Sequence, residues 1–132
     1  MRIYITHCTG IKNDSLKSSD EEVKPEALYA AVHTQRFIRK CKEVQATWAI
    51  FSDQYGIWFP DTKKKWYDKH PDSVTNEEFA ELLHGFDKIL KEFSEIWFYN
   101  HPSWFHSLYQ RIIRKSTLSQ RIRTFSHLNQ IV

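Results

Sequence analysis

Two short loops carry residues whose types and spacing could do chemistry. The first follows a predicted strand at 2–6 and has the sequence His7-Cys8-Thr9-Gly10-Ile11-Lys12. The second follows an apolar run at 47–51 and has the sequence Ser52-Asp53-Gln54-Tyr55-Gly56-Ile57. Two of the three glycines of the chain fall in these loops, and glycine permits tight turns and close approach of a ligand to the backbone. We therefore expect a ligand-binding site where the two loops meet.

The first loop offers two candidate catalytic residues. Lys12 lies in the loop after the first predicted strand, where its ammonium can donate to a phosphate or a base carbonyl. The alternative is an ordinary exposed lysine. Cys8 is a candidate nucleophile if its pKa is lowered by His7, Lys12 or a helix N-terminus. The alternative for Cys8 is a small, buried loop cysteine.

Further candidates follow the second and third apolar runs. Tyr55 offers a ring and a hydroxyl beside the turn at Gly56. Asp68 is expected to orient a base, to bond to Lys12 across a cleft, or to cap a turn. His101, after the run at 95–99, could donate to a carbonyl oxygen and stabilise charge on a departing base. Alternatively, the residues after His101 simply begin a helix, because proline suits the first helical turn.

Several function classes lack their motifs in this chain. There is no G-x-S-x-G, no P-loop and no G-x-G-x-x-G, which removes the main support for hydrolase, nucleoside triphosphatase and Rossmann hypotheses. The two cysteines have no C-x-x-C spacing and the seven histidines no H-E-x-x-H pattern. We therefore expect no metal site and no cofactor.

The elements that must position these residues alternate between strands and helices. Short segments rich in β-branched and aromatic residues predict strands at 2–6, 47–51, 95–99 and 122–125. Between them we expect a helix from Pro25 to about Lys42 that buries Val32 and Phe37, a helix starting at Thr75, and a helix over 103–115. A polar loop at 13–24 and an aromatic loop at 52–75 complete the pattern. This order predicts the α/β class: a three-layer α/β/α sandwich with a short, mainly parallel sheet of three or four strands.

Length and charge set wider limits. At 132 residues the chain is expected to form a single domain, 1–132, and its net charge of +3 is mild. The basic residues of the C-terminal segment, 111–132, form either a solvated face or a phosphate-contacting surface; they are Arg111, Arg114, Lys115, Arg121 and Arg123.

Cysteine usage and hydropathy bear on location. Two cysteines make no disulfide framework, which favours a reducing compartment. The chain shows no secretion signal and no apolar stretch near the ~18 residues that a membrane helix needs. We expect a cytoplasmic protein without membrane contact.

The motifs together resemble a small uncharacterised prokaryotic family over about residues 2–110. Its pattern is C-[ST]-x-x-K, then A-x-x-L-Y, S-x-x-Y-G-[LI] and Y-D; here these fall at 8–12, 27–29, 52–57 and 67–68. That family is similar in fold to uracil-DNA-glycosylase-like domains and to a domain of archaeal tRNA 7-deazaguanine-modifying enzymes. His101-Pro102-Ser103 is similar to the H-P-S loop of uracil-DNA glycosylases. The resemblance implies a base- or nucleotide-binding pocket lined by Cys8, Thr9, Lys12, Tyr55, Gly56 and Asp68. The glycosylase loop with its water-activating aspartate is missing, and Thr9 replaces the usual serine.

Residues and resemblance favour a nucleobase- or nucleotide-binding protein, acting on a modified base in nucleic acid if it is an enzyme at all. The first alternative is a non-catalytic DNA- or RNA-binding module that uses the basic C-terminal segment. The second is a protein-interaction domain that uses the Trp58–Trp66 surface. Whether the chain is an enzyme stays open at this point.

Overall fold

The computed structural model describes residues 1–100 and 105–132. Within these residues the main sheet has five strands in the order β4-β3-β1-β6-β7. Four of them run parallel to one another: β1 (Arg2–His7), β3 (Trp48–Ser52), β6 (Glu95–Tyr99) and β7 (Ile122–Phe125). The edge strand β4 (Gly56–Trp58) pairs antiparallel with β3. The predicted α/β class and mainly parallel sheet are confirmed, but the sheet has five strands instead of three or four.

The remaining elements are short apart from three helices. The α-helices are α1 (Pro25–Leu28), α2 (Val32–Glu43), α3 (Asn76–Leu90) and α4 (Ser107–Lys115). A separate two-stranded sheet joins β2 (Glu22–Val23) to β5 (Lys64–Lys65). Single turns of 3-10 helix are η1 (Asp14–Leu16), η2 (Pro71–Ser73), η3 (Ser119–Arg121) and η4 (Leu128–Gln130).

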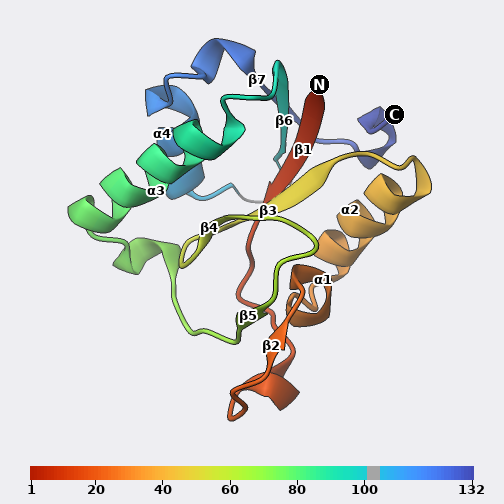
Figure 1. Ribbon diagram of the computed structural model, residues 1–132, viewed down its shortest axis with the longest axis vertical. Helices are drawn as coiled ribbons and strands as arrows, with labels where there is room; N and C mark the ends of the chain where they lie inside the picture. The colour runs from red at the N-terminus through yellow and green to blue at the C-terminus, as the bar shows by residue number, and fades with distance from the viewer. Residues whose placement is uncertain (101–104) are drawn as a thin grey trace.

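Both faces of the main sheet are covered by helices, as Figure 1 shows with α2 on one side and α3 and α4 on the other. Alternate residues of a strand face opposite sides of a sheet. On one face Phe37 of α2 packs on Trp48 and Tyr99. On the other face Phe51 contacts Phe86 of α3 and Tyr109 of α4. Coverage on both sides explains why β3 is buried along its whole length.

Helix α3 begins where the sequence predicts. The hydroxyl of Thr75 accepts from the backbone N–H of Glu78, and the Glu78 carboxylate accepts from the N–H of Thr75, which completes a capping box. The helix then buries residues three to four positions apart on the face toward the sheet, namely Phe79, Leu82, Phe86 and Leu90.

The predicted helix from Pro25 to Lys42 is wrong in one respect, because it is broken between α1 and α2. Tyr29 forms a β-bridge with Lys12, and the N–H of Ala30 donates to the carbonyl of Ile11 at 3.0 Å. These bonds hold residues 29–31 in an extended conformation. As a result Val32 is 66% exposed instead of buried, whereas Phe37 is buried as expected.

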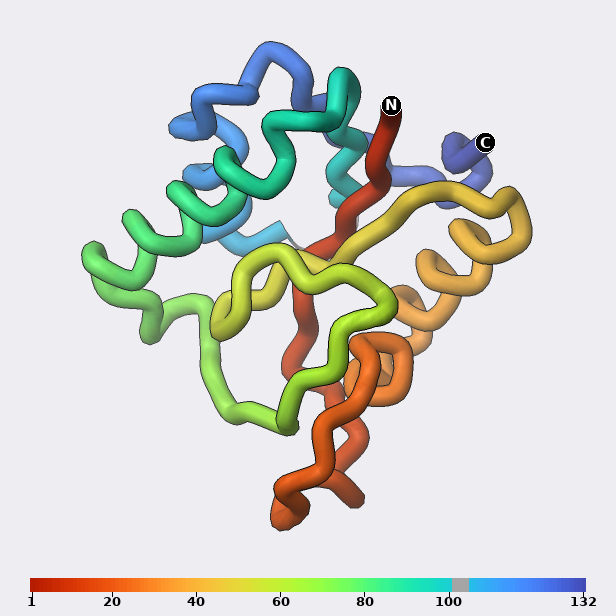
Figure 2. Tube along the Cα trace, in the orientation of Figure 1, coloured from red at the N-terminus to blue at the C-terminus, as the bar shows by residue number. Residues whose placement is uncertain are grey.

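The loops predicted at 13–24 and 52–75 contain more regular structure than expected. The first holds η1 and β2, and the second holds β4, β5 and η2. Figure 2 shows these two segments gathered near one end of the sheet, where β2 pairs with β5.

Strand order places a crevice at this same end. The connection after β1 carries α2 over one face to reach β3, whereas the connection after its other neighbour, β6, carries α4 over the other face to reach β7. The chain therefore leaves neighbouring strands in opposite directions at their carboxyl ends. Such a switch point is where open α/β sheets bind ligands. None of the helices in the described residues is long and apolar enough to cross a membrane.

Candidate functional site

A cleft of about 190 Å³ lies at the carboxyl ends of β1 and β3. We call it the strand-end cleft. Its lining comes from the segment after β1, the residue after β3, the approach to α3 and the start of α4: Cys8, Thr9, Gly10, Asp53, Lys69, His70, Pro71, His106 and Tyr109. Three predicted site residues, Cys8, Thr9 and Gly10, therefore line one cavity at the expected end of the sheet.

Register between β1 and β3 brings the two loops together. His7 lies opposite Phe51 in the parallel ladder, and the N–H of Cys8 donates to the carbonyl of Phe51 at 2.8 Å. Cys8 thus extends the ladder by one residue, which places its side chain beside Asp53, the first residue after β3. The backbone N–H of Asp53 points at Cys8 Sγ, with an N···S distance of 3.4 Å.

Asp53 is the polar centre of the cleft. Its side chain is buried, with only 2% of the residue exposed, and Oδ1 accepts a hydrogen bond from Cys8 Sγ at 3.4 Å. Burial raises the pKa of the Asp53 carboxyl, because desolvation disfavours the charged form; the Cys8 bond and the positive charges of Lys12 and Lys69 oppose this rise. Sequence reasoning missed Asp53, although an acid at the end of a largely apolar strand was an available signal.

Cys8 is held as a neutral thiol. Its Sγ lies 3.1 Å from the Tyr109 hydroxyl as well as beside Asp53. Burial, and next the negative charge of Asp53, raise the pKa of Cys8 to about 11, against a lowering effect of the Tyr109 bond. A nucleophilic role required a lowered pKa. The structure has the opposite environment, so Cys8 serves here as a hydrogen-bond donor to Asp53.

Lys12 is buried in a tightly bonded loop. The N–H of Asn13 donates to the carbonyl of Leu28 at 2.7 Å, so both neighbours of Lys12 are bonded to the segment before α2. Only 9% of Lys12 is exposed, and Nζ lies 4.5 Å from the centre of the Tyr67 ring. Lys12 does not line the strand-end cleft itself, but its charge acts on Asp53 behind the cleft wall.

Two histidines at the rim of the cleft were not predicted. His106 Nδ1 accepts from the N–H of Leu108 at 3.0 Å and so caps α4. The proton of the neutral ring therefore lies on Nε2, which donates to Asp72 Oδ1 at 2.6 Å. Asp72 also lies 3.3 Å from His70 Nδ1. This chain of contacts joins η2 to α4 across the cleft. His101, the predicted catalytic histidine, lies outside the described residues.

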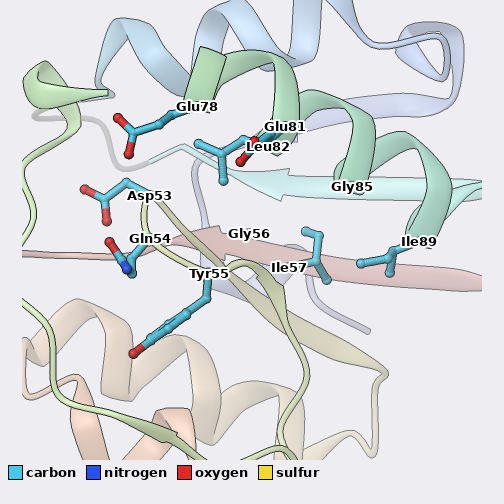
Figure 3. Close-up of a pocket in the computed structure, with 10 residues that line it drawn as sticks. All are labelled: Asp53, Gln54, Tyr55, Gly56, Ile57, Glu78, Glu81, Leu82, Gly85 and Ile89. Carbon is cyan, nitrogen blue, oxygen red and sulfur yellow. The ribbon is translucent and has the colours of Figure 1, made fainter. Parts of the chain in front are cut away.

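The other predicted ligand-binding residues lie elsewhere. Tyr55 and Gly56 line a second cavity, between β4 and α3 (Figure 3). The Tyr55 hydroxyl donates to the carbonyl of Lys65 at 2.9 Å, and Gly56 has φ +74, which favours glycine. Asp68 is exposed and outside the lining of the strand-end cleft. The expected Asp68–Lys12 bond is absent from the described residues; Lys12 lies over the Tyr67 ring instead.

The five basic residues of the C-terminal segment do not share one environment. Arg111 lies over the ring of Phe79, 4.2 Å from Cζ to the ring centre, on the α3 side of the sheet. Arg121 donates to the carbonyls of Lys91 at 2.7 Å and Phe93 at 3.2 Å, just after α3. Arg114 and Lys115 are exposed on α4, whereas Arg123 lies over the ring of Trp97. A nucleic-acid interface on this segment stays a prediction.

No protein-family model, curated protein or solved structure matches the chain. Among residues 1–100 and 105–132, no three His, Cys, Asp or Glu side chains gather where they could hold a metal ion.

Proposed function

We propose that the chain is a three-layer α/β/α domain that binds a nucleobase, free or as part of a nucleotide, in the strand-end cleft. The buried carboxyl of Asp53 carries this proposal, because it lies in a cleft at the switch point of the sheet. A buried titratable group with a shifted pKa in a cleft is a physical marker of a functional site.

The chemistry of the cleft suits a flat, polar ring. The rim and wall offer the rings of His70, His106 and Tyr109. Proteins that bind an isolated base pack such rings around it and bond to its hydrogen-bonding edge. An ionised carboxylate accepts through both oxygens. It therefore complements an edge with two adjacent N–H donors, as in guanine and 7-deazaguanine, better than the alternating edge of uracil.

The size of the cleft separates the base from the rest of a nucleotide. Pockets for drug-sized ligands have volumes of roughly 300–1,000 Å³. The strand-end cleft, at about 190 Å³, is smaller and takes one base. Sugar and phosphate then lie at the rim, where Lys69 is the cationic lining residue, its Nζ 2.8 Å from Glu78 Oε2.

Lys12 acts on the base through Asp53. Its positive charge favours the ionised carboxylate, which is the form that accepts two N–H bonds. Removing this charge is expected to move the pH at which binding is lost to a higher value. The proposal is for binding and includes no covalent step, because Cys8 is protonated at neutral pH.

A thermal-shift panel tests the proposal, with guanine, 7-deazaguanine, adenine and uracil as free bases, nucleosides and short oligonucleotides. A ligand present at 100 times its Kd stabilises the folded state by ~2.7 kcal/mol. For 132 residues this corresponds to a rise in Tm of roughly 10 °C. We expect guanine-type bases to stabilise the protein more than uracil, and Asp53→Asn to abolish the effect.

Lys12→Met and Lys17→Met form a matched pair of variants. Lys17 also lies over an aromatic ring, Trp66 at 5.6 Å, but is exposed. We expect Lys12→Met alone to shift the pH profile of binding upward. Equal stabilisation by all bases, or no stabilisation by any, would contradict the proposal. A response to oligonucleotides only, steeply reduced by salt, would favour the nucleic-acid-binding alternative.

A further inference from the structure

A second cavity, of about 200 Å³, lies between the edge strand β4 and helix α3. We call it the edge groove. Its lining comes from the turn before β4, from β4 and from one side of α3: Asp53, Gln54, Tyr55, Gly56, Ile57, Glu78, Glu81, Leu82, Gly85 and Ile89. The strand-end cleft shares only Asp53 with it.

The edge groove has an acidic end and an aliphatic end. Figure 3 shows the carboxylates of Asp53 and Glu78 at one end and the side chains of Ile57 and Ile89 toward the other. Ile89 is 39% exposed, so part of its apolar side chain faces the open groove. Three of the ten lining residues are acids and none is basic.

Negative charge at the acidic end is only partly balanced. Glu78 is paired with Lys69, and this pairing, with the bond from Thr75, lowers the pKa of Glu78 to about 2. Glu81 forms no ion pair within the described residues. It also lies four positions after Glu77, and like charges at this spacing repel each other along a helix. The groove is therefore complementary to a cation.

Packing does not explain the glycine in the middle of the groove. Gly85 lies inside α3, where glycine is less stable than alanine. A Cβ built at Gly85 meets no atom within 4 Å, so a side chain there would not clash. The main consequence of glycine at this position is open space in the groove.

We propose that the edge groove binds a lysine side chain of a partner protein. Lysine carries an ammonium on a four-carbon stem that packs well on apolar surface. Its stem would lie along Ile89 and Leu82, and its ammonium would reach Glu81 and the acids beyond it. A compact ammonium with three donors suits carboxylates that approach from different directions, whereas the flat fork of arginine suits a single carboxylate. The edge groove shares Asp53 with the strand-end cleft, but its binding of lysine does not require a base in that cleft.

The three glycines make a direct test possible. Protein labelled with ¹⁵N at glycine alone gives three backbone amide signals, from Gly10, Gly56 and Gly85. Gly10 lines the strand-end cleft, whereas Gly56 and Gly85 line the edge groove. On titration with acetyl-Ser-Lys-Ser-amide we expect the signals of Gly56 and Gly85 to shift while that of Gly10 stays. The same peptide with norleucine, which lacks the charge, is expected to shift them much less.

Two variants separate binding from folding. Gly85→Ala is expected to raise Tm by roughly 3 °C, because alanine favours the helix, yet to weaken the peptide by partly filling the groove. Glu81→Gln is expected to weaken the lysine peptide about threefold, as removal of one partly exposed charge pair does, and to leave the norleucine peptide unchanged.

Three results would overturn the proposal: equal shifts with both peptides, a shift of Gly10 alone, or undiminished binding in Gly85→Ala. A titration with guanine keeps the two proposals apart. It reports on Gly10, so the strand-end cleft can fail its test while the edge groove passes, and the reverse.

Discussion

Two buried tyrosines, Tyr29 and Tyr67, pack behind Lys12. Replacing them one at a time tests how much their hydroxyl hydrogen bonds contribute to stability. The hydroxyls of Tyr29 and Tyr67 lie 2.6 Å apart, and Ser52 Oγ donates to the Tyr67 hydroxyl at 3.1 Å. All three residues are buried, and burial raises the pKa of both phenols, so both stay protonated at neutral pH. The Ser52 hydroxyl also accepts from the N–H groups of Gln54 at 3.1 Å and Tyr55 at 3.0 Å, but its own proton is donated to Tyr67.

Tyr67→Phe is expected to cost more stability than Tyr29→Phe. Loss of a buried partner leaves an unsatisfied group at ~1–3 kcal/mol. Tyr67→Phe breaks two bonds and is expected to cost about 2 kcal/mol, whereas Tyr29→Phe breaks one and is expected to cost about 1 kcal/mol. With an entropy of unfolding near 280 cal/mol/K for 132 residues, these correspond to falls in Tm of roughly 7 and 3.5 °C.

The double variant makes the test decisive. The double variant breaks the same two bonds as Tyr67→Phe but also removes the Tyr29 hydroxyl that Tyr67→Phe leaves unpaired, so we expect it to cost no more than Tyr67→Phe alone. Calorimetry or urea unfolding of the four proteins gives the coupling free energy directly. Because phenylalanine keeps the ring beneath Lys12, base binding is expected to survive in Tyr67→Phe. Additive costs, or a larger cost for Tyr29→Phe, would refute this account of the hydroxyl cluster.

Three further predictions follow from single residues. The pKa of Asp53 is higher in the folded protein than in the unfolded chain. Wild-type stability therefore falls as the pH rises from the unfolded-state pKa of Asp53 to its folded-state pKa. Asp53→Asn should therefore be the more stable protein at pH 7 and lose its advantage in acid; thermal unfolding from pH 3 to 8 shows whether it does. Cys8, with a pKa of about 11, should react with iodoacetamide at pH 7.5 much more slowly in the native than in the urea-unfolded protein. Mass spectrometry measures the two rates, and equal rates would contradict a buried, protonated thiol. Gly56→Ala should cost about 1 kcal/mol from its positive φ alone, because its added Cβ meets Leu82 at an ordinary 3.8 Å; an unchanged midpoint in urea would show that the turn relaxes without strain.

Local patterns in the sequence were sufficient for the main strands and for the start of α3. Residues 48–51 and 96–99 are apolar without interruption, as strands covered on both faces must be, and the structure has β3 and β6 there. Thr75 and Glu78 have the spacing of a capping box, and the box is formed. In each case the decisive interaction lies within a few residues of the pattern that predicts it.

Elements that depend on distant partners were not predictable in this way. Strand β4 exists because residues 56–58 pair with β3, and nothing in the local sequence separates them from the rest of the aromatic segment. The break between α1 and α2 exists because Tyr29 pairs with Lys12, 17 positions earlier in the chain. Periodicity reports which residues tend to be apolar together and carries no information on such pairing.

The candidate site also has features that local sequence predicts and features that depend on distant residues. From the sequence alone, the loops after the strands at 2–6 and 47–51 could be placed at one end of a parallel sheet, and with them the candidate site residues Cys8, Thr9 and Gly10. Only the tertiary structure decided that Asp53 is buried against Cys8 and that α4 brings His106 and Tyr109 to complete the cleft. It also placed Tyr55 and Gly56 in a different cavity. The physical reason is that burial, and the pKa shifts that follow from it, depend on side chains far away in the chain, which no short motif contains.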